Sequence, residues 1–233
     1  MLSYWEKESL LHYDYIIIGS GIVGLSAAIS LKERAPQSRV MVLERDVLPT
    51  GGSTKNAGFA CIGSLTEILA DLQTMPPAAV LQLVGMRLAG LHLLRSRLGD
   101  DRIGYRENGS FELVGEGQEA ALQQMDSVNE MLGSLFNGRP AFTPANEYIR
   151  PFGFNPQQVK FLVRNNFEGE LHTGKMMRAL IDTAIARGVE IKTGCRVSGI
   201  DDFHTGVNVM VPHHTLQENI VFTASKALVC TNA

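Results

Sequence analysis

The sequence predicts an α/β fold, in which a sheet with parallel strands carries a β-meander and is joined to a second region with antiparallel strands. Apolar runs at residues 15–18 and 40–43 flank a helical pattern that begins at Ile22 and ends before Pro36. Continuous apolar runs are typical of parallel strands covered on both faces, and the order strand, helix, strand implies a right-handed crossover. Three alternating segments predict the meander: residues 196–201, 207–211 and 219–223.

Two helices are expected after the first crossover, over residues 66–72 and 78–98, because Pro76-Pro77 interrupts the helical pattern between them. The second helix has an apolar face that suits core packing, and an oligomer interface is the alternative. That face consists of Val80, Leu83, Val84, Leu88, Leu91, Leu94 and Leu98.

Asn108-Gly109 separates two strand-like segments, residues 105–107 and 111–114. This dipeptide between alternating segments is the strongest local signal for a β-hairpin, so we expect antiparallel pairing to begin here. A helix over about residues 118–135 follows, and then short strands and loops to about residue 166.

Regular structure returns at Thr173, a candidate helix N-cap, and this helix is expected to stop at Gly188. A short strand at 189–191 and a buried parallel strand at 227–230 should complete the sheet. These elements are expected to form a discontinuous first domain, residues 1–75 with 166–233, and a second region, residues 76–165.

Composition narrows the class of protein. The net charge is −3 with acidic and basic residues interspersed, so no basic stripe suggests nucleic-acid binding. Three cysteines match neither a disulfide framework nor a zinc site and fit a reducing compartment. The first residues lack a secretory signal, and no apolar run is expected to be long enough to span a bilayer. We expect a cytoplasmic protein.

The chemistry-bearing motif is Gly19-Ser20-Gly21-Ile22-Val23-Gly24, a GxGxxG that follows a predicted strand and opens a helix. Glu44 lies twenty residues after Gly24 at the end of the second strand, which completes the Rossmann-like dinucleotide fingerprint. Gly19 makes the tight turn, Gly21 lets the backbone approach a pyrophosphate, and Gly24 permits close helix packing. The Glu44 carboxylate can accept hydrogen bonds from ribose hydroxyls. This motif alone does not separate FAD from NAD.

Three further segments carry a family resemblance. Residues 51–60 read Gly-Gly-Ser-Thr-Lys-Asn-Ala-Gly-Phe-Ala, residues 169–175 read Gly-Glu-Leu-His-Thr-Gly-Lys, and residues 227–233 end in Cys-Thr-Asn-Ala. Together they resemble the D-amino-acid-oxidase-type superfamily of FAD-dependent oxidoreductases, which includes glycine and sarcosine oxidases. Two departures are Thr173, where proline is common, and Lys55, where arginine is frequent. The resemblance is weakest over residues 100–165.

The resemblance implies FAD as cofactor and assigns its contacts. It also implies that residues 1–75 with 166–233 are an FAD-binding domain, incomplete at its C-terminus, and that residues 76–165 are part of a substrate or cap domain. The ADP half would be held by Gly19, Ser20, Gly21, Ile22, Gly24, Glu44 and Arg45. The pyrophosphate or isoalloxazine would contact Ser53, Thr54, Asn56, Ala57 and Gly58, and the adenine would contact the Val197 backbone. The turn that closes over the FAD would consist of Thr231, Asn232 and Ala233. In such proteins the chain continues well beyond this point, and the later half supplies the groups that bind the substrate carboxylate. The resemblance therefore implies a truncated chain or one half of a split enzyme.

The implied activity is oxidation of the C–N bond of an amino acid or secondary amine, by hydride transfer to flavin N5. One alternative is a flavoprotein dehydrogenase acting on a hydroxy acid or glycerol phosphate. Another is a non-catalytic FAD-binding module, or a subunit that needs a companion chain or a homo-oligomer. The substrate and the electron acceptor are left open.

Other chemically active residues have structural explanations. His172 is a weak catalytic candidate, because a single histidine before a helix is more often structural. Cys61 near the flavin loop is expected to be a buried, inert cysteine and not a covalent flavin link. His213-His214 point to opposite faces of a strand, so no metal site is expected.

Overall fold

The computed structural model describes residues 2–213 and 218–231. The chain forms two compact units, one of Met1–Ala57 with Thr173–Ala233 and the other of Gly58–His172. Sequence analysis instead placed the domain boundaries after residue 75 and before residue 166. The segment after Gly58 belongs to the second unit because Leu65 and Ile68 of its first helix are buried in that unit's core.

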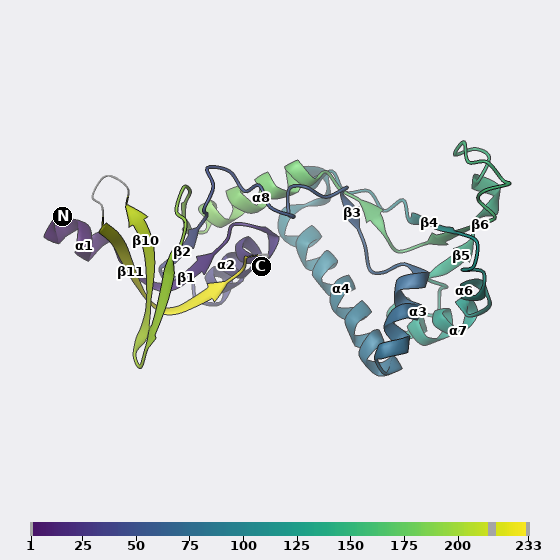
Figure 1. The fold of residues 1–233 in the computed structure, drawn as a ribbon, viewed down its shortest axis with the longest axis horizontal. Coiled ribbons are helices and arrows are strands. Elements are labelled where there is room, and N and C mark those ends of the chain that lie inside the picture. The colour runs from purple at the N-terminus through teal and green to yellow at the C-terminus, as the bar shows by residue number, and fades with distance from the viewer. Residues whose placement is uncertain (1, 214–217, 232–233) are drawn as a thin grey trace. The chain divides into compact units, whose positions relative to one another are not determined.

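The first unit contains a six-stranded sheet in the order β8-β2-β1-β11-β10-β9 (Figure 1). The strands β1, β2, β8 and the second half of β11 run parallel, while β9 and β10 extend the sheet as an antiparallel meander. Its elements are α1 (Tyr4–Leu10), β1 (His12–Ile18), α2 (Ile22–Arg34), β2 (Val40–Leu43), α8 (Thr173–Ala186), β8 (Glu190–Lys192), β9 (Gly199–Phe203), β10 (Gly206–His213) and β11 (Glu218–Val229).

Apolar content explains why these strands lie at the centre. All four residues of β2 are buried, as are Ile16, Ile17 and Ile18 of β1, and α2 packs against both strands and against α8. Continuous apolar runs of this kind bury both faces of a strand, as predicted for the crossover. The α/β fold class and the βαβ unit are thus confirmed.

One strand is longer than the sequence predicted. Residues 219–223 and 227–230 were expected to be separate strands, but β11 continues from Glu218 to Val229. Its first part pairs antiparallel with β10 as far as Ala224, and its second part pairs parallel with β1 from Thr223 onward. No glycine or proline interrupts this segment, so one strand serves both the meander and the parallel sheet.

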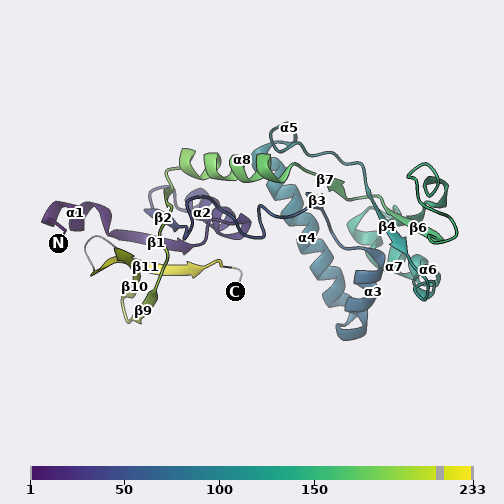
Figure 2. The same ribbon diagram turned by 45° about the horizontal axis from the view of Figure 1, so that its top comes forward.

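The second unit packs helices against one face of a three-stranded sheet ordered β4-β6-β5, with a separate β3-β7 pair (Figure 2). Its core includes Ile68, Val84, Leu132, Phe142 and Val163. Its elements are β3 (Phe59–Ala60), α3 (Leu65–Thr74), α4 (Pro77–Leu98), α5 (Asp100–Ile103), β4 (Ser110–Val114), α6 (Ala120–Gln123), α7 (Met125–Leu132), η1 (Gly133–Leu135), β5 (Phe142–Pro144), η2 (Asn146–Tyr148), β6 (Phe161–Asn165) and β7 (Gly169–Glu170).

The hairpin predicted at Asn108-Gly109 is wrong. The two segments beside it do not pair with each other, because β4 pairs with β6 and Arg106 forms a bridge with Glu170. Gly109 does turn the chain, with φ of +77°, and its N–H donates to the carbonyl oxygen of Glu168. Residues 105–114 therefore run alongside 161–170, and Gly109 allows the close approach of these two segments.

Helix α4 is apolar but mostly exposed. Val80, Val84 and Leu98 are buried, whereas Met86 is 65% exposed and Leu93 is 46% exposed. Among the described residues it is the one helix long and apolar enough to cross a membrane, and 17% of its apolar window is buried. The expectation that no apolar run has this length needs correction for α4, but one such helix is weak evidence for a membrane span.

Candidate functional site

The first glycine turn of the GxGxxG motif excludes any larger residue. Gly19 has φ of +106°, and a Cβ there would lie 2.7 Å from the carbonyl oxygen of Cys230. A Cβ on Gly24 would lie 2.0 Å from the carbonyl oxygen of Gly19. The chain therefore needs glycine at Gly19 for its conformation and at Gly24 for helix packing, as the motif predicts.

The N-terminus of α2 meets the loop that follows β2. The Ile22 N–H donates to Ser53 Oγ at 2.9 Å, and a Cβ on Gly21 would lie 2.9 Å from the same oxygen. Because Ser53 accepts this bond, its own hydroxyl proton remains able to donate to a third group. N-terminal helix amides and this hydroxyl together favour an anion such as a phosphate.

Glu44 links the end of β2 to the glycine turn. Its Oε2 accepts hydrogen bonds from the N–H of Ser20 at 3.0 Å and from the Ser20 hydroxyl at 2.6 Å. Among the described residues, its Oε1 accepts a hydrogen bond from the Asp46 N–H alone, at 3.2 Å. A carboxylate can accept about four hydrogen bonds, so the Oε1 oxygen retains capacity for a ligand hydroxyl.

Asn56 organises the rest of this loop. Its side-chain N–H₂ donates to the carbonyl oxygens of Gly52 and Ser53, at 3.2 and 3.0 Å. The Thr173 hydroxyl donates to Asn56 Oδ1 at 2.8 Å, which joins the loop to the start of α8. Sequence analysis expected Thr173 to be the helix N-cap, whereas it is the first residue of α8. It also missed this link, since the two residues lie 117 positions apart.

The remaining residues assigned to the cofactor are less closely grouped. Arg45 is exposed and pairs with Asp46, Val197 packs beside the meander core, and Thr231 is exposed. Ala57 and Lys55 are exposed in the loop, and Thr54 closes a turn onto Gly51. Gly58 and His172 belong to the second unit, where the His172 N–H donates to the Ile103 carbonyl oxygen. Asn232 and Ala233 lie outside the described residues.

Cys61 is exposed, so the expectation of a buried cysteine is wrong. Partial burial of its sulfur, together with the negative charges of Glu168 and Glu67, raises the pKa of the thiol to about 11. Because the thiolate is the nucleophilic form, this supports an inert cysteine at neutral pH.

Metal binding finds no support among the described residues, which contain no group of three or more histidine, cysteine or acidic side chains able to hold an ion. His213 lies at the end of β10 opposite Glu218. His214 falls outside the described part of the chain.

Comparisons with known proteins identify the family of this chain. The profile of the FAD dependent oxidoreductase family matches residues 14–233. The chain belongs to this family. No curated protein matches the sequence. The family assignment confirms the resemblance drawn from residues 51–60, 169–175 and 227–233.

Solved structures show the same fold. Glycine oxidase from Geobacillus kaustophilus is 21% identical with a TM-score of 0.70, covering 95% of this chain and 55% of its own. L-amino acid deaminase from Proteus myxofaciens, in complex with anthranilate, is 20% identical with a TM-score of 0.68, covering 94% and 45%. L-proline dehydrogenase from P. horikoshii is 16% identical with a TM-score of 0.68, covering 96% and 54%. The chain thus spans about half the length of these proteins.

The residues present fit the ADP half of FAD. The Ser53 hydroxyl lies against Gly21 at the α2 N-terminus and has a proton to donate, and Glu44 offers Oε1 to a ribose hydroxyl. Each group is held by hydrogen bonds within the first unit. Together they form a site whose donor and acceptor pattern matches a pyrophosphate followed by a ribose.

Proposed function

We propose that this chain is the FAD-binding part of an oxidoreductase that oxidises the C–N bond of an amino acid or secondary amine. The observation that carries the proposal is the Glu44–Ser20–Ser53 arrangement around the α2 N-terminus in a member of the FAD-dependent family. Neighbouring folds named as glycine oxidase, L-amino acid deaminase and L-proline dehydrogenase support an amino-acid substrate.

In this proposal the chain's own residues bind and orient the cofactor. The α2 N-terminal amides and the Ser53 hydroxyl hold the pyrophosphate, and Glu44 accepts a ribose hydroxyl. The buried position of Glu44, which is 8% exposed, keeps water from competing for that bond. FAD, when bound, supplies the acceptor for the hydride that leaves the carbon beside the nitrogen; the amine proton passes to solvent and the imine is hydrolysed.

The test is a visible absorption spectrum of the purified chain, before and after denaturation, followed by anaerobic addition of substrates. We expect a flavin band that is released on denaturation. Glycine, sarcosine, proline and larger amino acids should bleach this band when the substrate site is complete, whereas lactate and glycerol 3-phosphate should not. Bleaching by lactate or glycerol 3-phosphate alone would transfer the assignment to the hydroxy-acid class.

A second candidate is a subunit or FAD-binding module that completes its substrate site with another polypeptide. The observation that favours it is the exposure of apolar side chains on α4, since Met86 is 65% exposed and Leu93 is 46% exposed, and exposed apolar surface can mark a contact with another chain. Intact mass and multi-angle light scattering test it. A stable monomer of 25.5 kDa that turns over an amine would exclude this candidate. We also propose a cytoplasmic location, on the grounds of the cysteine content.

A further inference from the structure

The loop over residues 51–56, which follows β2 in the first unit, is open at its beginning. Gly51 and Gly52 are exposed, and a Cβ added to either of them would meet nothing within 4 Å. The N–H and the hydroxyl of Thr54 both donate to the Gly51 carbonyl oxygen, at 3.1 and 3.0 Å, and so close a turn within the loop. A turn of this kind does not fix where the loop lies in the unit, so its position depends on bonds to other elements.

Asn56 joins this loop to the start of α8. Its side-chain N–H₂ donates to the carbonyl oxygens of Gly52 and Ser53, at 3.2 and 3.0 Å, so the amide organises the loop around it. The Thr173 hydroxyl donates to Asn56 Oδ1 at 2.8 Å and also lies 3.5 Å from the Asn56 carbonyl oxygen. Because only the oxygen end of the amide accepts a proton, this bond orients Asn56 with its N–H₂ directed into the loop.

Ser53 is the residue at which the loop meets the glycine turn. Its Oγ accepts from the Ile22 N–H at the start of α2, at 2.9 Å, while its carbonyl oxygen accepts from Asn56. The side chain of Ser53 is thus held by α2 and its backbone by Asn56. The direction of the Ser53 hydroxyl proton therefore depends on both bonds, and through Asn56 on the hydroxyl of Thr173.

The helix itself does not need the hydroxyl of Thr173. Thr173 is the first residue of α8, so its side chain is not in the N-cap position. Proline is favoured at the first residue of a helix, because the N–H there has no partner within the helix. The side chain is half-buried, which limits competition from water for its bond to Asn56. The structure thus uses this hydroxyl to hold the loop and not to begin the helix.

We propose that Thr173 is a positioning residue for FAD, which acts through Asn56 to hold Ser53 at the pyrophosphate site beside the α2 N-terminus. The inference rests on the proposed function, because it assigns the Ser53 hydroxyl to the cofactor. Thr173 makes no contact with the cofactor in this account. It connects the site to α8, which begins 117 positions after Asn56 in the sequence.

The test is the FAD affinity of the 233-residue chain and its Thr173 variants, measured by titration with flavin fluorescence. Thr173→Val keeps the shape of the side chain without the hydroxyl and should weaken FAD binding about fivefold, as expected for one neutral hydrogen bond. Thr173→Ser restores the donor and should recover most of the affinity. Thr173→Pro keeps a favourable helix start and should behave as Thr173→Val does. If Thr173→Val does not fold, Thr173→Ala decides by the same criteria.

Coupling to Ser53 distinguishes positioning from a general effect on the fold. Because Thr173 acts on Ser53, adding Thr173→Val to Ser53→Ala should weaken FAD binding no further than Ser53→Ala does alone. Visible circular dichroism of the bound flavin, recorded at saturating FAD, is the second readout. Its spectrum should change in Thr173→Val and return in Thr173→Ser.

Thr223→Val is the matched control in the same unit. The Thr223 hydroxyl of β11 donates to Asn208 Oδ1 of β10 at 3.1 Å, so this variant removes a bond between the same two chemical groups. That bond lies in the meander and has no link to the 51–56 loop. FAD affinity should therefore be unchanged in Thr223→Val.

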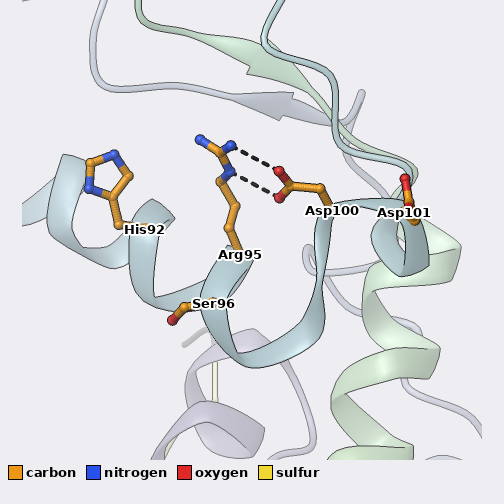
Figure 3. Close-up of a pocket in the computed structure, with 5 residues that line it drawn as sticks. All are labelled: His92, Arg95, Ser96, Asp100 and Asp101. Atoms are coloured by element: carbon orange, nitrogen blue, oxygen red, sulfur yellow. Dashed lines mark hydrogen bonds and ion pairs between the residues drawn. The ribbon is translucent and has the colours of Figure 1, made fainter.

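A second control lies in the surface pocket of the second unit. The pocket is lined by His92, Arg95, Ser96, Asp100 and Asp101. Figure 3 shows Arg95 paired with both oxygens of Asp100, at 3.0 and 2.9 Å, and Arg95 also donates to Glu107 at 3.1 Å. Its charge is balanced by these carboxylates and is not available to a ligand. Ser96→Ala removes a hydroxyl that donates to its own helix, at Leu93, and should leave FAD affinity unchanged.

Unchanged FAD affinity in Thr173→Val would overturn the inference. So would an equal loss in Thr173→Ser or in Thr223→Val, or a full additional loss when Thr173→Val is combined with Ser53→Ala. Failure of the unmodified chain to bind FAD would reject the FAD site and this inference together. FAD binding that does not respond to Thr173 would reject only the positioning role and leave the proposed function standing.

Discussion

Among the described residues, each unit contains one buried glutamate whose hydrogen bonds join two segments of the chain. These two glutamates, Glu44 and Glu168, differ in their hydrogen-bond partners. Glu44 in the first unit accepts two hydrogen bonds on Oε2 from Ser20, inside the glycine turn, and one long bond on Oε1. Glu168 in the second unit accepts two hydrogen bonds on Oε1, from the N–H groups of Ile62 at 2.6 Å and Gly63 at 3.0 Å. Its Oε2 accepts from the Ser110 hydroxyl.

The difference separates a binding carboxylate from a structural one. Glu168 is 3% exposed and joins the segment before α3 to β4, so removing it would leave buried donors unpaired. Glu44 lies beside an α2 N-terminus that favours anions and keeps an oxygen with spare capacity. We infer that Glu168 maintains the fold of its unit, whereas Glu44 maintains a site.

The largest expected effect is that of Gly24→Ala in the first unit. The new Cβ would lie 2.0 Å from the Gly19 carbonyl oxygen, so the helix must move away from the turn. We expect a loss of more than about 3 kcal/mol in the free energy of unfolding, together with loss of FAD, measured by thermal unfolding and the flavin spectrum. Gly90→Ala in α4 is the control, because its Cβ meets nothing within 4 Å and should change stability by less than about 1 kcal/mol.

Glu168→Ala should destabilise the protein by about 3 kcal/mol without weakening FAD binding. The cause is the loss of an acceptor for the N–H groups of Ile62 and Gly63 and for the Ser110 hydroxyl. Urea unfolding monitored by circular dichroism measures the first effect, and FAD titration measures the second. A stable variant that loses FAD would contradict the distinction between the two glutamates.

Ser53→Ala tests the role of the first unit in FAD binding. It removes the acceptor of the Ile22 N–H at the start of α2, a loss that for helix caps costs about 1 kcal/mol. Because the hydroxyl also has a proton for the pyrophosphate, FAD affinity should fall several-fold. Thr54→Ala in the same loop removes a hydroxyl that donates only to Gly51, and equilibrium dialysis should show a smaller change for it.

The smallest effect concerns Cys61, close to Glu168. With its pKa raised to about 11, the thiol is almost fully protonated at pH 8. Its thiolate fraction at that pH is about 100-fold smaller than that of a thiol with a pKa of 9, but the more basic thiolate is the stronger nucleophile. We therefore expect iodoacetamide to label it about tenfold more slowly, with the rate rising as pH approaches 11. Mass spectrometry of timed samples measures the rate. Fast labelling at pH 7 would contradict the assignment of an inert cysteine.

Local patterns predicted the first unit well, because its site is built from neighbouring residues. The turn at Gly19, the helix from Ile22 and the strand before Glu44 all lie within about thirty residues, so apolar periodicity and glycine spacing are sufficient. The second unit depends on pairings between distant segments. Glu168 accepts hydrogen bonds from Ile62, Gly63 and Ser110, which lie 106, 105 and 58 positions before it in the sequence.

The same reason explains the wrong hairpin at Asn108-Gly109. That dipeptide provides the turn, but β4 pairs with β6, about fifty residues further along the chain. Likewise, the sequence between Thr223 and Ala227 has no feature to show that one strand serves two ladders. Thr173 has no motif that pairs it with Asn56, so only the structure reveals the hydrogen bond between them.

The most direct test of the central claim is FAD affinity in the pair Glu44→Gln and Glu168→Gln, measured by quenching of flavin fluorescence on binding. The account predicts that Glu44→Gln weakens FAD binding about tenfold, since a charged hydrogen bond to the ribose is replaced by a neutral one. Glu168→Gln should bind FAD as the unmodified chain does. Equal affinity for both variants, or weaker binding only in Glu168→Gln, would contradict the assignment of the βαβ unit as the FAD site.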